Sequence, residues 1–174
     1  MSIESTPVSS LMTRNVITQT EDQNVHAVSK TMHENNIGCV VIVRNKDRDN
    51  DISSSNKPIG IITERDVVRL LGSLNPSLLH IPLHDIMTKP VITVSANSSI
   101  RDVIQTMQQK NVRRLVISNG EKMTGIITDK DIFKAIMNNQ NLIPSLLNEK
   151  MLIQSRPVYD QFGQYWFSDI LRRS

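Results

Sequence analysis

The chain repeats itself, and this repeat constrains the fold more than any other feature of the sequence. Residues 12–18 read MTRNVIT and return at 87–93 as MTKPVIT, while 60–66 read GIITERD and return at 125–131 as GIITDKD. The first pair of segments is 75 residues apart and the second pair 65, so the first copy carries ten additional residues. Matching segments in the same order predict two copies of one fold.

Hydrophobic periodicity predicts the same order of elements in both copies, β-α-β-β-α. In the first copy we expect, in chain order, an extended piece over 16–18, a helix over 24–34, strands over 37–43 and 59–62, and a helix from Thr63 to Leu71 that ends at Gly72. In the second copy we expect, in the same order, a helix over 100–110 capped by Ser98 or Ser99, strands over 112–117 and 124–127, and a helix over 129–137.

The additional residues of the first copy fall in the polar stretch 44–58, which predicts a long hairpin loop where the second copy has a short turn at 118–120. These boundaries divide the chain into four parts. They are a first domain, a linker, a second domain and a C-terminal extension, over residues 9–72, 73–83, 84–140 and 141–174.

Composition excludes several classes of protein. The longest apolar run, 37–43, has seven residues, whereas a membrane helix needs about 20. The N-terminus lacks the basic start and apolar core of a signal peptide, and the single cysteine cannot form an internal disulfide, so we expect a cytoplasmic protein without membrane contact. A net charge of +3 permits nucleic-acid binding without indicating it.

The two openings and the two Gly-Ile-Ile-Thr-x-x-Asp endings, each in the same slot of its repeat, resemble the paired CBS domain family, also called Bateman modules. The resemblance covers roughly residues 9–140. It implies an α+β fold in which two β-α-β-β-α repeats pack about a pseudo-two-fold axis, sheet against sheet. It also implies two clefts that bind adenosine-containing ligands, and a regulatory module that stands alone and is not an enzyme.

The Thr-x-x-Asp pairs, Thr63 with Asp66 and Thr128 with Asp131, suit such a ligand chemically. A carboxylate accepts hydrogen bonds from the two hydroxyls of a ribose, and a threonine hydroxyl at a helix N-terminus suits a phosphate. The alternative is structural, because Thr followed three residues later by an acid resembles a helix capping box. Both roles can coexist in one residue pair.

The family pattern groups the candidate residues into two sites that share an interface between the copies. Site A, which we expect to bind better because it contains two arginines, comprises Ile61, Thr63, Asp66, Val91, Ile92, Arg113, Arg114 and Val116. Site B comprises Val16, Ile17, Gly38, Cys39, Val41, Ile126, Thr128 and Asp131. The structural alternative for Arg113 and Arg114 is a surface pair bonded to neighbouring carboxylates.

The expected ligand is an adenine nucleotide, AMP, ADP or ATP, that acts as a regulatory ligand and not as a catalytic cofactor. S-adenosylmethionine and cyclic dinucleotides are less favoured. Because such modules commonly pair through their helices, we expect a homodimer. The rival hypothesis is an adaptor for a partner protein or nucleic acid with vestigial clefts, and nucleic acid ranks last.

Three other features of the sequence could belong to a functional site but are better explained as structural. Cys39 lies in an apolar run and reads as a buried structural thiol. The pairs His26 with His33 and His80 with His84 lack a third ligand, so we expect no metal site.

The C-terminal extension holds five of the six aromatic residues of the chain, Tyr159, Phe162, Tyr165, Trp166 and Phe167. Docking of residues 156–174 on the protein's own domain or on a sister subunit is the first interpretation. Recognition of a partner protein or of single-stranded nucleic acid is the alternative.

Overall fold

The computed structural model describes residues 6–44, 57–72, 76–120 and 122–138. In this part of the chain, six strands form two sheets of three, ordered β1-β2-β3 and β4-β5-β6. The strands are β1 Thr18–Thr20, β2 Cys39–Val43, β3 Pro58–Thr63, β4 Thr93–Ser95, β5 Arg114–Asn119 and β6 Lys122–Thr128. The helices are α1 Val25–Asn35, α2 Glu64–Leu71, α3 Leu83–Ile86, α4 Ile100–Gln109 and α5 Asp129–Asn138, with short 3-10 helices at Val8–Ser10 and Pro76–His80.

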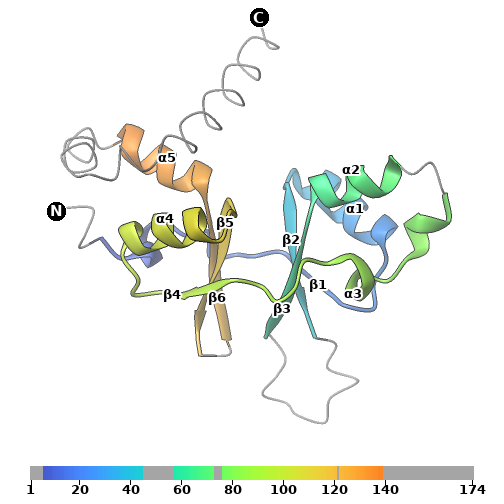
Figure 1. The fold of residues 1–174 in the computed structure, drawn as a ribbon, viewed down its shortest axis with the longest axis horizontal. Coiled ribbons are helices and arrows are strands. Elements are labelled where there is room, and N and C mark those ends of the chain that lie inside the picture. The colour runs from blue at the N-terminus through green and yellow to red at the C-terminus, as the bar shows by residue number, and fades with distance from the viewer. Residues whose placement is uncertain (1–5, 45–56, 73–75, 121, 139–174) are drawn as a thin grey trace, which may run out of the picture.

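The two repeats have the same topology, which confirms the predicted β-α-β-β-α order. In each sheet the first strand runs parallel to the second and the second runs antiparallel to the third. The helices α1 and α2 cover the outer side of one sheet and α4 and α5 that of the other, while β2 and β5 face each other at the centre (Figure 1). We call the halves repeat 1 and repeat 2.

Some boundaries differ from the sequence-based expectation, for a local reason. The strand expected from Ile37 begins at Cys39, because Asn36 adopts a left-handed conformation with φ 51° and the Ile37 N–H bonds the Met32 carbonyl at 3.0 Å. This hydrogen bond closes the end of α1. Repeat 2 ends α4 in the same way, through Asn111 and Val112, so β5 begins at Arg114. The opening strand of repeat 1 also begins later than the expected extended piece over 16–18, since β1 starts at Thr18.

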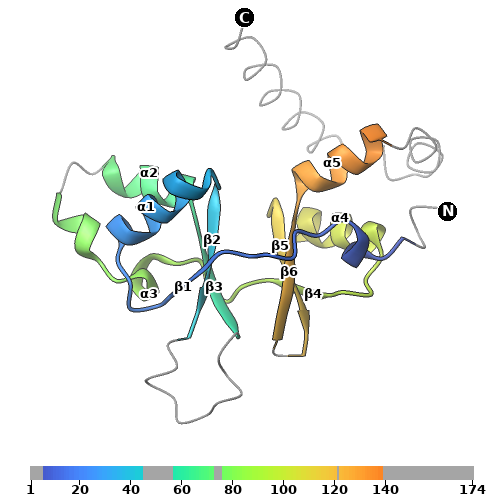
Figure 2. The ribbon, with the colours of Figure 1, turned by 180° about the vertical axis from the view of Figure 1, so that it is seen from behind.

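The segment that opens each repeat packs into the core of the other repeat. Val8 and Met12, which precede the first sheet in the sequence, lie in the core of repeat 2. Leu83 and Met87, which precede the second sheet, lie in the core of repeat 1. The chain therefore crosses between the halves twice: the crossing that leads to β4 runs in front in Figure 1, and the crossing that leads to β1 runs in front in Figure 2, the view from behind.

Backbone hydrogen bonds fix both exchanged segments. Thr13 and Ile126 bond each other through both N–H groups at 2.9 Å, and Thr88 and Ile61 do the same at 2.9 and 3.1 Å. Each exchanged segment thereby pairs with the last strand of the other repeat. Neither half has a complete core without the segment supplied by the other.

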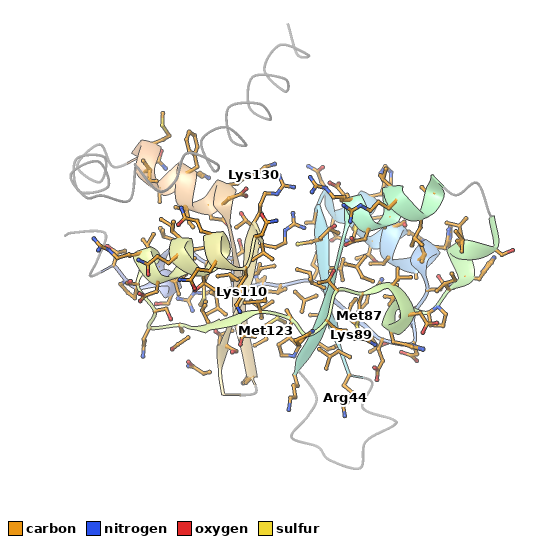
Figure 3. The ribbon with its side chains drawn as sticks, viewed as in Figure 1. Arg44, Met87, Lys89, Lys110, Met123 and Lys130 are labelled. Atoms are coloured by element: carbon orange, nitrogen blue, oxygen red, sulfur yellow. The ribbon has the colours of Figure 1, made fainter. Side chains whose placement is uncertain are left out.

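Two glycines make room for these crossings. Met87 lies against β3 at Gly60 (Figure 3), so close that a Cβ at Gly60 would stand 2.4 Å from the Met87 Sδ atom. At the equivalent position, a Cβ at Gly125 would stand 2.7 Å from the Met12 Sδ atom and 2.9 Å from the Thr13 carbonyl oxygen. The first residue of each Gly-Ile-Ile-Thr ending is thus a packing requirement of the exchange.

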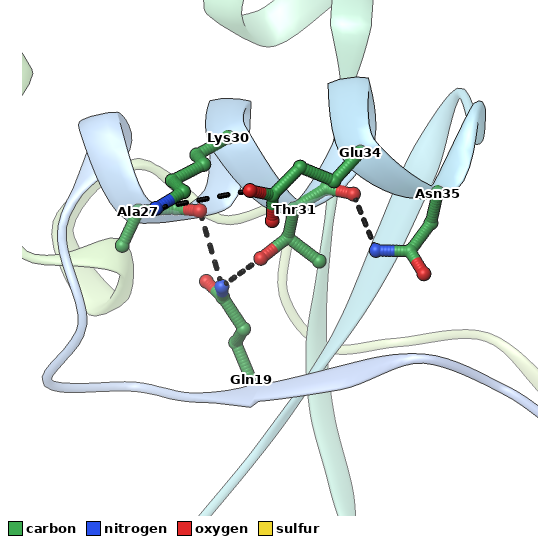
Figure 4. Close-up of polar contacts among 6 residues, drawn as sticks. All are labelled: Gln19, Ala27, Lys30, Thr31, Glu34 and Asn35. Carbon is green, nitrogen blue, oxygen red and sulfur yellow. Dashed lines mark hydrogen bonds and ion pairs between the residues drawn. The ribbon is translucent and has the colours of Figure 1, made fainter.

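The helix α1 is fixed to its sheet by Gln19 on β1. The Gln19 Nε2 atom donates to the Thr31 Oγ1 atom at 2.6 Å and to the Ala27 carbonyl at 3.2 Å (Figure 4). The Lys30–Glu34 ion pair on the same helix spans 3.7 Å between exposed side chains and contributes little to stability. The contact between Gln19 and α1 therefore sets how the helix lies on β1.

Two features predicted from the sequence fall outside the described residues. They are the polar loop over most of 44–58 and the aromatic cluster of the extension 141–174. Among the helices that the structure describes, none has the length and apolar character needed to cross a membrane.

The first prediction concerns the exchanged packing. Gly60→Ala should lower the free energy of unfolding by about 1 to 3 kcal/mol, as for other overpacked cores, because the added methyl group collides with Met87. Gly72→Ala is the matched control, since its methyl group would meet its nearest neighbour at 3.4 Å, an ordinary contact distance. Urea unfolding of both variants checks the prediction. Equal stability losses at Gly60 and Gly72 would contradict it.

Candidate functional site

The two Thr-x-x-Asp pairs lie at equivalent strand-to-helix junctions, where β3 enters α2 and β6 enters α5. The Thr63 hydroxyl donates to the Asp66 Oδ2 atom at 2.7 Å, and the Thr63 N–H donates to the same oxygen at 2.9 Å. The Thr128 hydroxyl and N–H bond the Asp131 Oδ2 atom at 2.7 and 2.8 Å. The capping interpretation is therefore confirmed, since α2 begins with a capping box and α5 repeats its geometry.

The capping role leaves part of each carboxylate available. Both hydrogen bonds from Thr63 end on a single oxygen of Asp66, and the same holds for Thr128 and Asp131. All four residues are half-buried. Each aspartate is thus held in one orientation by its cap while its second oxygen, Oδ1, accepts no hydrogen bond within the described residues. A fixed carboxylate oxygen of this kind can accept a hydrogen bond from a ligand hydroxyl.

The backbone that precedes β2 and β5 closes over these helix starts. The Glu64 N–H of α2 donates to the Gly38 carbonyl at 3.2 Å, and the Asp129 N–H of α5 donates to the Arg113 carbonyl at 3.0 Å. Cross-strand register also places Cys39 opposite Thr63 and Arg114 opposite Thr128. Each junction therefore includes the beginning of the neighbouring strand of its own repeat.

Arg114 connects the two junctions. Its guanidinium Nη1 atom donates to the Gly38 carbonyl at 3.1 Å, across the interface between repeat 2 and repeat 1. Arg114, expected in site A, therefore contacts Gly38 and Cys39, both expected in site B, and reaches the carbonyl that the first residue of α2 also bonds. At the equivalent place in repeat 1 stands Cys39, which is neutral, so the cation is found on one side of the pseudo-symmetric interface only.

The environment of Cys39 combines burial with charge. Burial raises the pKa of the Cys39 thiol above its ordinary value, and the nearby Glu64 carboxylate raises it further. The charge of Arg114 and a hydrogen bond from its side chain lower that pKa. The net shift is upward, which fits the expectation of a structural thiol better than that of a nucleophile.

The apolar residues expected in both sites meet in one cluster at the interface of the repeats. Val41, Val116 and Ile126 are buried there, and Val16, Cys39, Ile61, Val91 and Met123 pack against them. Val41 and Val116 have no exposed surface at all, so in this state they hold the sheets together. The half-buried members of the cluster keep some exposed surface, so these side chains are the ones that a ligand could contact.

The remaining candidates are placed around this cluster. Ile92 packs against the core of repeat 2, and the Ile17 carbonyl accepts the Val41 N–H at 3.4 Å. Arg113 is exposed and has an interaction partner. The sequence reasoning missed Met123, which lies on the same strand as Ile126, and Glu64, the residue directly after Thr63.

The histidines are placed without a metal-ligating cluster. His84 contacts the Glu21 carbonyl through Nδ1 at 3.1 Å and pairs with Asp85 through Nε2 at 3.3 Å, while His26 and His33 are exposed on α1. Over the described ranges, no group of three His, Cys, Asp or Glu residues could hold a metal ion.

Comparison with known proteins decides the family. The profile of the CBS domain matches residues 8–73 and again residues 83–138. The chain belongs to the CBS domain family. An uncharacterized protein of Methanopyrus kandleri is 35% identical to this CBS pair over 133 residues, which are 76% of this chain and 63% of that relative. This CBS pair therefore spans a little under two thirds of that relative's length.

Solved structures share the fold. A CBS-domain containing protein from Agrobacterium tumefaciens is 27% identical, with a TM-score of 0.63 over 75% of this chain and 93% of its own. The CBS domain pair of protein MJ0100, solved in complex with 5-methylthioadenosine and S-adenosyl-L-methionine, is 23% identical, with a TM-score of 0.64 over 76% of this chain and 97% of its own. The predicted α+β fold with tandem CBS repeats is confirmed.

The second prediction separates the capping role of Thr63 from any role in binding. Thr63→Ala should destabilise the protein by about 0.5 to 2 kcal/mol, because it removes the hydroxyl that caps α2. Thr63→Ser keeps a hydroxyl at the same position and should retain most of this stability. Thermal and urea unfolding provide the measurement, and a serine variant as unstable as the alanine variant would argue against the cap.

Proposed function

We propose that this CBS pair is a non-catalytic regulatory module that binds an adenine nucleotide, AMP, ADP or ATP, between its two repeats. It signals the bound state through a change in conformation or assembly. The observation that carries the proposal is the pair of equivalent junctions, each with an aspartate oriented by its cap. The cationic side chain of Arg114 lies beside one of them.

The aspartates supply recognition of the ribose. A ribose carries two adjacent hydroxyl donors, and a carboxylate with a free oxygen accepts from them. Asp66 is already oriented by two hydrogen bonds from Thr63, so binding does not have to restrict its side chain further. The half-buried side chains of Ile61 and Val91 in the interface cluster can flank the purine in site A.

Arg114 favours a ligand that carries phosphate. Its guanidinium lies at the start of α2, where the helix dipole also favours negative charge. Arg113 adds a second cation on the adjacent residue. Site B, with Thr128 and Asp131, faces Cys39 at the equivalent position and lacks this charge, so we propose site A as the nucleotide site and site B as weaker.

Other adenosyl ligands remain alternatives in the same clefts. The related fold of MJ0100, solved with 5-methylthioadenosine and S-adenosyl-L-methionine, supports an adenosyl ligand here. The positive charge of Arg114 favours the more anionic nucleotides over S-adenosylmethionine, and a cyclic dinucleotide ranks behind both. Cytoplasmic location and action through a partner bound by residues 156–174 also remain proposals.

The third prediction tests the nucleotide site. In a thermal-shift screen of AMP, ADP, ATP, S-adenosylmethionine and cyclic dinucleotides, the adenine nucleotides should stabilise the protein most. By calorimetry, Asp66→Ala should weaken the best nucleotide by about 1.5 to 3 kcal/mol, the range for a hydrogen bond to a charged group. Asp131→Ala should have a smaller effect.

A matched control exists in α4. Asp102 forms the same capping box with Ser99, at 2.8 Å from its hydroxyl, but it is exposed and lies next to the N-terminal 3-10 helix. Asp102→Ala should cost stability without changing nucleotide affinity. If no nucleotide binds, the adaptor hypothesis replaces this proposal, and if Asp131→Ala is the more damaging change, the two sites are in the wrong order.

The fourth prediction concerns assembly. Val68 and Leu71 on α2 are 65% and 52% exposed, and Met137 on α5 is 59% exposed, which leaves apolar helix surface to be covered. We therefore propose a homodimer formed through these helices. Light scattering should give twice the chain mass of 19.7 kDa.

Substitutions on α2 test the proposed dimer surface. Val68→Lys with Leu71→Lys should give a monomer, whereas Gln105→Lys, exposed on α4, should leave the dimer intact. A monomeric wild-type protein would rule this interface out.

A further inference from the structure

Arg114 makes a side-chain hydrogen bond that runs from the start of β5 in repeat 2 to the backbone just before β2 in repeat 1. Its Nη1 atom donates to the Gly38 carbonyl at 3.1 Å, although the two residues are 76 positions apart. Arg114 begins β5, and Gly38 immediately precedes β2. The bond therefore joins the two central strands at the ends that border the helix starts.

This bond can be released at small cost to the protein. The Gly38 carbonyl also accepts the Glu64 N–H at 3.2 Å, so it keeps a hydrogen-bond partner when Arg114 leaves. A buried carbonyl that loses its last partner pays a large desolvation penalty, but this carbonyl does not. Arg114 is thus held by a contact that the acceptor does not depend on.

The guanidinium also lacks a neutralising partner. Arg114 is half-buried, and within the described residues no carboxylate lies within 4.0 Å of its nitrogen atoms as an ion pair. Glu64 lies in the same region, since a carboxylate oxygen of Glu64 would stand 3.1 Å from a Cβ at Gly38, and its charge raises the pKa of the Cys39 thiol that Arg114 lowers. A partly desolvated cation with unused donors binds a phosphate more strongly than an exposed one.

From these contacts we propose that Arg114 is a latch between the repeats that a ligand phosphate displaces. In the protein without ligand it holds β5 to Gly38. When an adenine nucleotide occupies the cleft, the guanidinium transfers to the phosphate and the direct link between the repeats is released. This inference rests on the proposed nucleotide site and adds the way in which occupation of that site changes the contact between the halves.

The single cysteine of the chain reports the position of the latch. The Cys39 thiol is hydrogen-bonded by Arg114, and the positive charge lowers its pKa against the opposing effects of burial and Glu64. Departure of the guanidinium removes this stabilisation of the thiolate. The Cys39 pKa should then rise, and alkylation at a fixed pH below that pKa should become slower.

The experiment measures the rate of Cys39 alkylation by iodoacetamide across an alkaline pH series, with AMP, with adenosine and without ligand. Saturating AMP should shift the midpoint of the wild-type profile upward and slow the reaction several-fold at neutral pH. Adenosine lacks the phosphate and should leave the midpoint in place. Shielding of the thiol by bound ligand is recognised separately, because it lowers the limiting rate at high pH without moving the midpoint.

Arg114→Gln provides the matched variant. Without ligand its midpoint should already lie above that of the wild type, and saturating AMP should move it little further. Arg114→Lys tests geometry, since a lysine keeps the charge but not the forked donors. Calorimetry on the same samples establishes whether AMP and adenosine are bound. If the variant binds adenosine but no longer binds AMP, Arg114 contacts the phosphate, and the shift of the wild-type midpoint with AMP then decides whether the guanidinium leaves Gly38.

The outcomes distinguish the latch from the site. AMP that binds by calorimetry without moving the wild-type midpoint overturns the latch and leaves the nucleotide site standing. An equal shift in wild type and Arg114→Gln also overturns it, because the phosphate field alone then explains the effect. If neither AMP nor adenosine binds, the proposed function fails and the latch fails with it.

Discussion

The structure depends on the exchange of opening segments between the repeats. Met12 fills the core of repeat 2 and Met87 fills that of repeat 1, each directly above a glycine of the opposite sheet. Because interiors are packed at crystalline density, neither core closes unless the partner's segment is in place. The interface between the sheets, with Val41 and Val116 fully buried, lies between the two cores that the exchanged segments complete. The two Thr-x-x-Asp junctions, Arg114 and the apolar cluster, which together form the candidate site, lie along that interface.

The candidate site is therefore built from elements whose first duty is structural. Asp66 caps a helix, and the side chains that can border a purine also hold the sheets together. The proposed function uses the groups that these structural roles leave available, one carboxylate oxygen at each junction and the guanidinium of Arg114. In the proposed function, the caps orient the two aspartates in advance, so ligand binding does not have to order them.

Much of this could be predicted from the sequence, because a duplication shows each element twice. The order of elements, the caps at Thr63 and Ser99 and the end of α2 at Gly72 follow from local signals that do not require tertiary contacts. The first residues of the strands were harder to predict from the sequence. Ile37 looks like strand by composition, but the left-handed Asn36 uses it to close α1, and an asparagine gives only a weak signal for that conformation.

The exchange and the inter-repeat bond of Arg114 could not be predicted from local patterns. Nothing near Met87 indicates which of two equivalent cores it enters, since both are lined by the same kinds of aliphatic side chain. Likewise, the family pattern grouped Arg114 with site A, whereas the structure shows that it contacts Gly38 and Cys39, which were expected in site B. Side-chain reach across an interface depends on how the sheets pack, which periodicity does not encode.

The pairing of Arg114 with Cys39 has a consequence for the history of the chain. Two separate single repeats that exchanged their openings would form a symmetric dimer, and every position near the axis would be occupied by two identical residues. Two arginines at this point would bring like charges together in a half-buried place, which costs energy, and two cysteines would supply no charge. Joining the copies in one polypeptide removes this restriction. The duplicated gene can place a cation on one side and a neutral thiol on the other, so that one of the two proposed sites can specialise while the equivalent residues of the other keep the fold intact.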